Sequence, residues 1–187
     1  MIPVAAGNAK AQTSLGVTAA ARGREMIGKE VIHQSSGRRL GQVSDLLLDP
    51  TGRRVEALVL GRGVLQGRAC AVPVGSIAGM GPDAVLVDDE PVDPDAVLGK
   101  GQQRWSEMRR LSGKPVLTRT GRELGVLDDV LFDEATGNVT GYRLSGGFVA
   151  DLLDGRQTLA PTRLTVGDEA LLADGVPELD LGPSVEG

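Results

Sequence analysis

The chain contains the same sequence pattern twice, and this duplication limits the available folds more than any other feature. The first occurrence is Gly28-Lys29-Glu30-Val31 followed by Leu40-Gly41-Gln42-Val43-Ser44-Asp45, and the second, 84 or 85 positions later, is Gly113-Lys114-Pro115-Val116 followed by Leu124-Gly125-Val126-Leu127-Asp128-Asp129. A long period that occurs only twice favours tandem modules, because solenoids stack shorter units at least three times. We therefore expect two self-contained copies of one small domain.

Each copy consists of short segments with the composition of β-strands. In the first copy, two of them flank Asp49-Pro50-Thr51-Gly52, which places Asp, Pro and Gly where a tight turn prefers them. The expected strands are 30–33, 40–48, 53–60, 69–73, 74–78 and 84–87, with counterparts at 115–118, 124–132, 138–144, 158–160, 162–166 and 170–173. Six short strands without a convincing helix predict an antiparallel barrel, since closure removes the open edges of a small sheet. The predicted fold class is all-β, with two consecutive small antiparallel β-barrels.

Composition shifts indicate where the two barrels begin and end. Prolines and acidic residues after residue 87 mark a boundary, and 103–111 can form about two helical turns with Trp105, Met108 and Leu111 on one face. The expected division is a disordered N-terminal tail (1–24), a first barrel (25–90), a linker with a short helix (91–110), a second barrel (111–175) and an acidic C-terminal tail (176–187).

Charge and composition argue against several classes of function. A formal net charge of -5 opposes the electrostatic attraction on which most nucleic-acid binding depends, so we do not expect direct binding to nucleic acid. The single cysteine excludes an intrachain disulfide and is compatible with the cytoplasm, where we expect the protein to be located. No segment has the length and hydropathy of a membrane helix.

Recurring aspartates are the first candidates for a chemical site. Asp45, Asp49, Asp128, Asp129 and Asp133 recur on corresponding strands and could supply oxygen ligands to a hard cation. Turn capping and hydrogen bonds near a strand bend explain them better, since no calcium-type loop is present. The sole histidine, His33, and the sole cysteine, Cys70, have no counterparts in the second copy. We therefore expect no catalytic residues, metal or cofactor, and no enzyme activity.

The duplicated segments resemble the PRC-barrel family. The resemblance rests on the Gly-Lys segments, the long Leu-Gly strands, the Asp-x-x-Gly hairpin, and Val72-Pro73 and Ala160-Pro161 with Ile77 and Leu164 after them. The family includes the cytoplasmic domain of the photosynthetic reaction-centre H subunit and the carboxy-terminal domain of a ribosome-maturation factor. The resemblance implies a small all-β barrel of bacterial type that holds other macromolecules.

These observations together predict an adaptor or assembly module that binds protein partners. Alternatives from the resemblance are a peripheral component of a membrane or photosynthetic complex, and a ribosome or RNA-processing accessory that acts through protein contacts. Homo-oligomerisation stays open. Trp and Arg are enriched at binding hot spots, and an exposed apolar loop near Tyr142 could dock a partner. The candidate partner-binding residues are Arg104, Trp105, Arg109, Phe148 and Leu152. For the Trp105 segment, a structural lead-in that packs on its own barrel is the favoured alternative, and Phe148 and Leu152 could instead close the barrel end.

Overall fold

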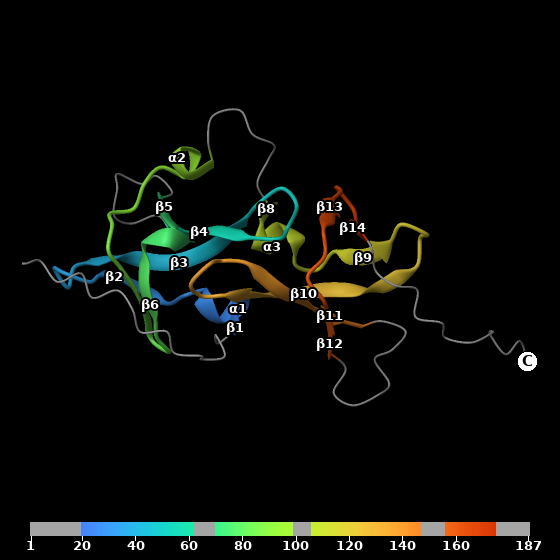
Figure 1. Ribbon diagram of the computed structural model, residues 1–187, viewed down its shortest axis with the longest axis horizontal. Coiled ribbons are helices and arrows are strands. Elements are labelled where there is room, and N and C mark those ends of the chain that lie inside the picture. The colour runs from blue at the N-terminus through green and yellow to red at the C-terminus, as the bar shows by residue number, and fades with distance from the viewer. Residues whose placement is uncertain (1–19, 62–69, 99–105, 147–155, 175–187) are drawn as a thin grey trace, which may run out of the picture.

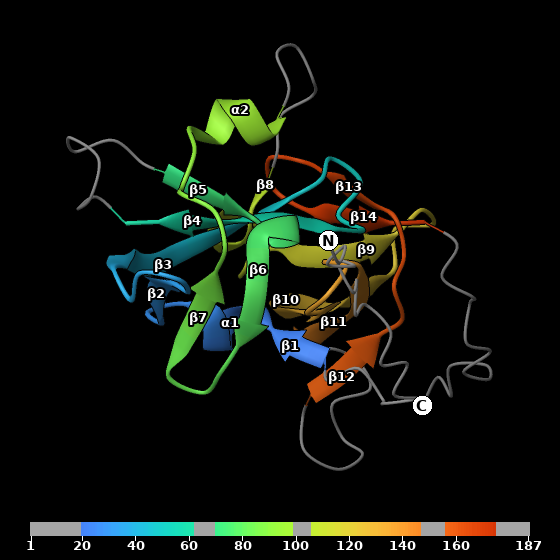
Figure 2. The same cartoon turned by 60° about the vertical axis from the view of Figure 1, so that its left-hand side comes forward.

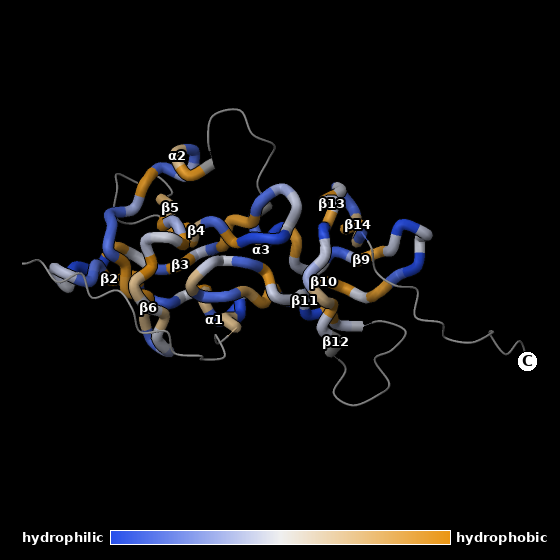
Figure 3. Tube along the Cα trace, viewed as in Figure 1, coloured by the Kyte–Doolittle hydropathy of each residue, from blue (hydrophilic) through white to orange (hydrophobic). Residues whose placement is uncertain are grey.

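The computed structural model describes residues 20–61, 70–98, 106–146 and 156–174, and every statement on structure below refers to these residues (Figure 1). Within them, short strands dominate and helices are limited to single turns. Apolar and hydrophilic stretches alternate along the strands of both copies (Figure 3), as expected for strands that bury one face.

The first copy forms a strand path in the order β5-β4-β3-β2-β7-β6. Its elements are β2 (Glu30–His33), β3 (Arg39–Leu48), β4 (Val55–Leu60), β5 (Cys70–Pro73), the 3₁₀ turn η1 (Val74–Ser76), β6 (Ile77–Met80) and β7 (Ala84–Val87). The strand predicted at 74–78 begins as this 3₁₀ turn, which joins β5 to β6, the two ends of the hydrogen-bonded path.

The second copy repeats the path in the order β12-β11-β10-β9-β14-β13. Its strands are β9 (Pro115–Thr118), β10 (Glu123–Asp133), β11 (Val139–Ser145), β12 (Arg156–Leu159), β13 (Leu164–Val166) and β14 (Leu171–Ala173). The two copies thus confirm a mostly β fold built twice from one plan.

The expectation of purely antiparallel sheets is wrong for one strand pair in each copy. β2 and β7 run parallel with Val31 opposite Val85, and β9 and β14 run parallel with Val116 opposite Leu171. These pairs bring the first strand of a copy beside its last strand, so the whole copy serves as the long crossover that parallel pairing requires. Among the described residues, no pairing of β5 with β6 or of β12 with β13 completes a closed barrel.

The segment that leads into each copy packs on the other copy. β1 (Ala20–Arg22) and α1 (Gly23–Met26) precede the first copy, yet β1 pairs with β10, and Figure 2 shows it beside the strands of the second copy. β8 (Ser106–Glu107) and α3 (Met108–Leu111) precede the second copy, and β8 pairs with β3. Within the described residues, each lead-in strand therefore pairs with the barrel of the other copy, whereas the sequence favoured packing on its own barrel for the Trp105 segment.

The hairpins of the two copies also meet reciprocally. The Val55 amide donates to the Gly137 carbonyl and the Val139 amide donates to the Arg53 carbonyl, both at 2.8 Å. Arg54 and Asn138 face each other in an antiparallel bridge between these two bonds. Reciprocal contacts between equivalent residues define an isologous interface, so the two copies are related by an approximate two-fold axis that passes near this bridge.

One hydrophobic core extends through both copies. A single cluster contains Leu48 and Val55 of the first copy, Phe132 and Val139 of the second, and buried apolar residues of both lead-ins: Ala21, Met26, Met108 and Leu111. This differs from the two self-contained modules expected from the repeat. Residues 20–24, expected in the N-terminal tail, accordingly lie in β1 and α1.

The repeated Gly-Lys segment has a structural role in each copy. Gly28 and Gly113 both have a φ of 88°, which a residue with a side chain adopts only with strain. The lysines that follow donate through Nζ to carbonyls of the last β-turn in each copy, Lys29 to Gly81 and Lys114 to Gly167, each at 2.7 Å. The motif therefore ties the first strand to the turn before the last strand.

The part of the linker before residue 99 packs on the first copy. The short helix α2 (Pro94–Leu98) lies over β4 and β5, where Val97 packs on a small apolar cluster of Leu47, Ala57, Val59 and Ala71. Ala71 and Val92 exchange two backbone hydrogen bonds of 2.8 Å. The linker helices of the described chain are thus α2 and α3, each shorter than the two-turn helix expected at 103–111.

Candidate functional site

The turn aspartates have the capping role that the sequence predicted. Asp49 accepts hydrogen bonds from the amides of Thr51 and Arg54, at 3.2 and 2.8 Å. Asp133 accepts from the amides of Ala135 and Thr136, at 3.0 and 2.8 Å. These carboxylates close the hairpins and satisfy amides that would otherwise lack partners.

Asp45 and Asp129 join each barrel to the lead-in of the other copy. Each lies beside a β-bulge, is almost fully buried, and accepts at Oδ1 from the amide of the next residue at 2.8 Å. The same oxygen of Asp129 accepts from the Arg24 amide at 2.9 Å, and that of Asp45 from the Arg109 amide at 3.2 Å. The sequence predicted hydrogen bonding at a strand bend but not that the second donor comes from the other copy.

Burial changes the acidity of these two carboxyl groups. Desolvation raises the pKa of Asp45 and of Asp129 above its usual value, and the backbone hydrogen bonds to each carboxylate offset only part of that rise. A carboxyl group with a raised pKa in the folded state favours folding when protonated. That contribution is complete below the unfolded pKa of about 3.9 and is lost as the pH rises through the folded pKa.

We therefore expect Asp45→Asn and Asp129→Asn to gain stability relative to wild type as the pH rises. The amide side chain keeps an oxygen for the two backbone donors but carries no charge that burial could penalise. The measurement is the free energy of unfolding in urea across the acidic range up to neutral pH. Asp83→Asn, at an exposed turn position, is the control. A wild-type protein that instead gains stability over both variants with rising pH would show that the carboxylate is favoured in the folded state.

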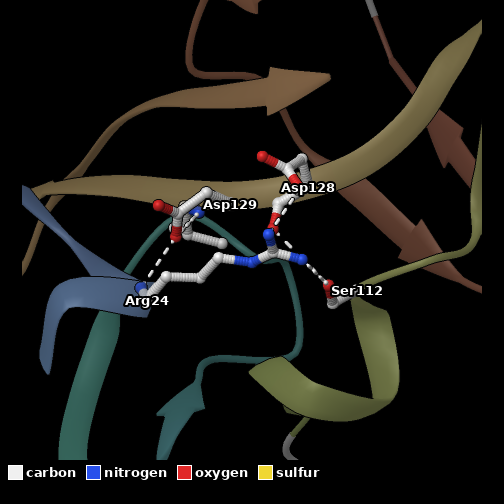
Figure 4. Close-up of polar contacts among 5 residues, drawn as sticks. Arg24, Ser112, Asp128 and Asp129 are labelled. Carbon is white, nitrogen blue, oxygen red and sulfur yellow. Dashed lines mark hydrogen bonds and ion pairs between the residues drawn. The ribbon is translucent and has the colours of Figure 1, made fainter. Parts of the chain in front are cut away.

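The side chain of Arg24 is held between the two copies (Figure 4). Its guanidinium forms an ion pair with Asp128, Nη1 to Oδ1 at 2.8 Å, and its Nη2 donates to Ser112 Oγ at 3.4 Å. The Asp128 side chain is only 15% exposed whereas that of Arg24 is 54% exposed. The lead-in of the first copy is therefore fixed by both its backbone and its side chain.

Arg109 occupies the equivalent position in the other half but lacks the equivalent partners. Its amide is bound to Asp45 as that of Arg24 is bound to Asp129. However, Ser44 precedes Asp45 where Asp128 precedes Asp129, and Ile27 replaces Ser112 after the helical turn. Among the described residues, the exposed Arg109 side chain forms no ion pair. Arg109 is thus the one candidate binding residue that lies within the described chain, and its side chain is on the surface.

The remaining candidate residues from the sequence either lie outside the described residues or are buried. Arg104, Trp105, Phe148 and Leu152 lie outside the described residues. Tyr142, expected near an exposed loop, is fully buried instead, because its hydroxyl crosses to the first copy and donates to the Gly52 carbonyl. Burial also raises the pKa of its phenol.

The remaining reactive side chains have structural surroundings. His33 is half-buried, and its Nδ1 lies 3.0 Å from Ser36 Oγ and 3.3 Å from Ser35 Oγ within its own turn. Cys70 is buried on β5 opposite Leu60. Within the part of the chain that the structure describes, no three His, Cys, Asp or Glu residues gather as metal ligands do. No helix in that part has the length and hydropathy to cross a membrane.

Comparison with known protein families shows a match over most of the chain. A family model described as PRC-barrel domain matches the chain twice, over residues 20–92 and 106–180. Both matches begin at or beside the exchanged lead-in strands β1 and β8. No curated protein matches the chain.

Proposed function

The chain belongs to the PRC-barrel domain family, and from this membership we propose that it is a non-enzymatic adaptor or assembly module that binds protein partners through its two barrels. Domains of this family are generally protein-interaction modules. In this chain the two domains share one core, so a partner would meet a single body with two related faces.

The observation that carries the proposal is that the polar residues repeated in both copies hold the fold together. Asp45 and Asp129 bind the exchanged lead-ins, and Lys29 and Lys114 bind turn carbonyls. We therefore assign partner binding to exposed residues whose surroundings differ between the two copies. Arg109 is one of these residues. Surfaces of that kind suit recognition of a macromolecule.

Affinity capture of the tagged full-length chain from a lysate of its source organism tests this function. Quantitative mass spectrometry compares the wild type with Trp105→Ala and Arg109→Gln, and with Arg53→Gln, an exposed arginine on the hairpin, as the control. We expect a protein in stoichiometric amount that Trp105→Ala or Arg109→Gln loses and Arg53→Gln retains. A wild-type capture without any stoichiometric protein would reject the adaptor function.

Sedimentation experiments with the same lysate distinguish the two alternative functions. Sedimentation of the native protein with membranes would assign it to a peripheral membrane or photosynthetic complex, and sedimentation with ribosomes would assign it to ribosome or RNA processing. We expect neither association to survive removal of the protein partner, because the acidic chain has weak electrostatic attraction for anionic lipid or RNA.

A further inference from the structure

Approximate symmetry between the two copies reveals a salt bridge that is complete in one half and incomplete in the other. In both halves a lead-in arginine donates its amide to a buried aspartate, so the two side chains leave the backbone at equivalent places. Arg24 then meets the carboxylate of Asp128 at 2.8 Å. Arg109 forms no ion pair with a carboxylate among the described residues, although its charge favours the ionised form of the buried Asp45 carboxyl.

The residues around Arg109 explain why the chain does not complete this second salt bridge. Ser44, at the position of Asp128, has no charge, and its hydroxyl donates to the Val59 carbonyl at 3.2 Å. Glu107, the nearest acidic residue along the chain, is paired with Arg110, Nε to Oε2 at 3.1 Å. The guanidinium of Arg109 is therefore anchored at its backbone and exposed at its end.

We propose that Arg109 binds a carboxylate supplied by another protein, an aspartate or glutamate side chain in an acidic segment of the partner. The contact would reproduce between proteins the ion pair that Arg24 and Asp128 make within the chain. The inference rests on the proposed adaptor function and names the chemistry of one contact in it. Arg can present paired N–H donors to a carboxylate, which favours this ligand over a neutral hydrogen-bonding group.

Three variants of the full chain change this contact in defined ways. Ser44→Asp supplies the missing carboxylate internally and should occupy Arg109, whereas Ser44→Asn has similar size without the charge. Asp128→Ser removes the internal partner of Arg24 and recreates the Arg109 arrangement in the other half. The Nε–Hε resonances of Arg109 and Arg24 in the NMR spectrum report each site separately.

The probe is a short polyglutamate peptide at low ionic strength, with glutarate as a free dicarboxylate. In the wild type we expect the peptide to shift the Arg109 resonance saturably and leave that of Arg24 unchanged. Ser44→Asp should weaken peptide binding by about fivefold, near the upper limit for an exposed ion pair, and Ser44→Asn should not. In Asp128→Ser the Arg24 resonance should respond as well.

An Arg109 resonance that does not move with the peptide, or equal affinity in wild type and Ser44→Asp, would overturn the proposal. Glutarate binding as tightly as the peptide would also overturn it, since the ligand would then be a small molecule. Capture from lysate with the Ser44→Asp variant keeps this result separate from the adaptor function. A partner that this variant captures in the same amount as the wild type at limiting concentration would reject only the Arg109 contact, whereas no partner on the wild type would reject the adaptor itself.

Discussion

Replacement of Gly137 by alanine is expected to destabilise the whole protein by about 4 kcal/mol, among the larger effects of a single substitution. Gly137 has a φ of +74°, and a Cβ there would lie 2.2 Å from the Val55 carbonyl oxygen and 3.3 Å from Val74 Cγ1. The oxygen belongs to backbone of the other copy, so it can move only if the contact between the copies opens. The expected loss lowers the melting temperature by about 8–16 °C for a chain of this size.

Gly121→Ala is the matched control for this substitution. Gly121 also has a positive φ, +85°, but a Cβ there would meet nothing within 4 Å. Its cost should be limited to the left-handed conformation, about 1–2 kcal/mol. Unfolding in urea measures both values. Equal losses in the two variants would mean that backbone conformation accounts for the whole effect and that the copies do not press together at Gly137.

The positions of most strands and the hairpin turn of each copy could be predicted from the sequence because local chemistry determines them. Turn residues such as Asp49 and Gly52 fix the hairpin, and alternating apolar residues fix which face of the strands is buried. The parallel pairing of β2 with β7 could not be predicted in this way. It depends on how the two ends of the copy meet in space, and no local pattern reports that.

The exchange of lead-ins could not be predicted from the sequence because the two copies offer similar partners. Ala21 lies beside Phe132, but in an unexchanged arrangement it would lie beside Leu48, the equivalent residue of its own copy. Both partners are large and apolar, so composition does not favour either arrangement. The incomplete salt bridge at Arg109 did leave a signal, since alignment of the copies places Ser44 against Asp128. That difference gains meaning only when the lead-ins are known to cross.

Cutting the chain between the two copies is expected to leave them associated. A site for a specific protease placed within residues 99–105 would separate a fragment carrying β1 and α1 from one carrying β8 and α3. Each fragment would still hold the other through its lead-in and through the Val55–Gly137 and Val139–Arg53 hydrogen bonds. The cut removes only the covalent link, which for a short linker corresponds to an effective concentration in the millimolar range.

The cut protein should elute in size-exclusion chromatography at the volume of the uncut insertion variant and give two bands on a denaturing gel. Its melting temperature should fall on dilution, because unfolding then also separates two chains. The first fragment produced alone should not fold, since Met26, Leu48 and Val55 would lose the part of their shared core that the second copy supplies. Fragments that elute separately, each with a cooperative melting transition, would show that the copies are independent domains and that the exchanged lead-ins contribute little to stability.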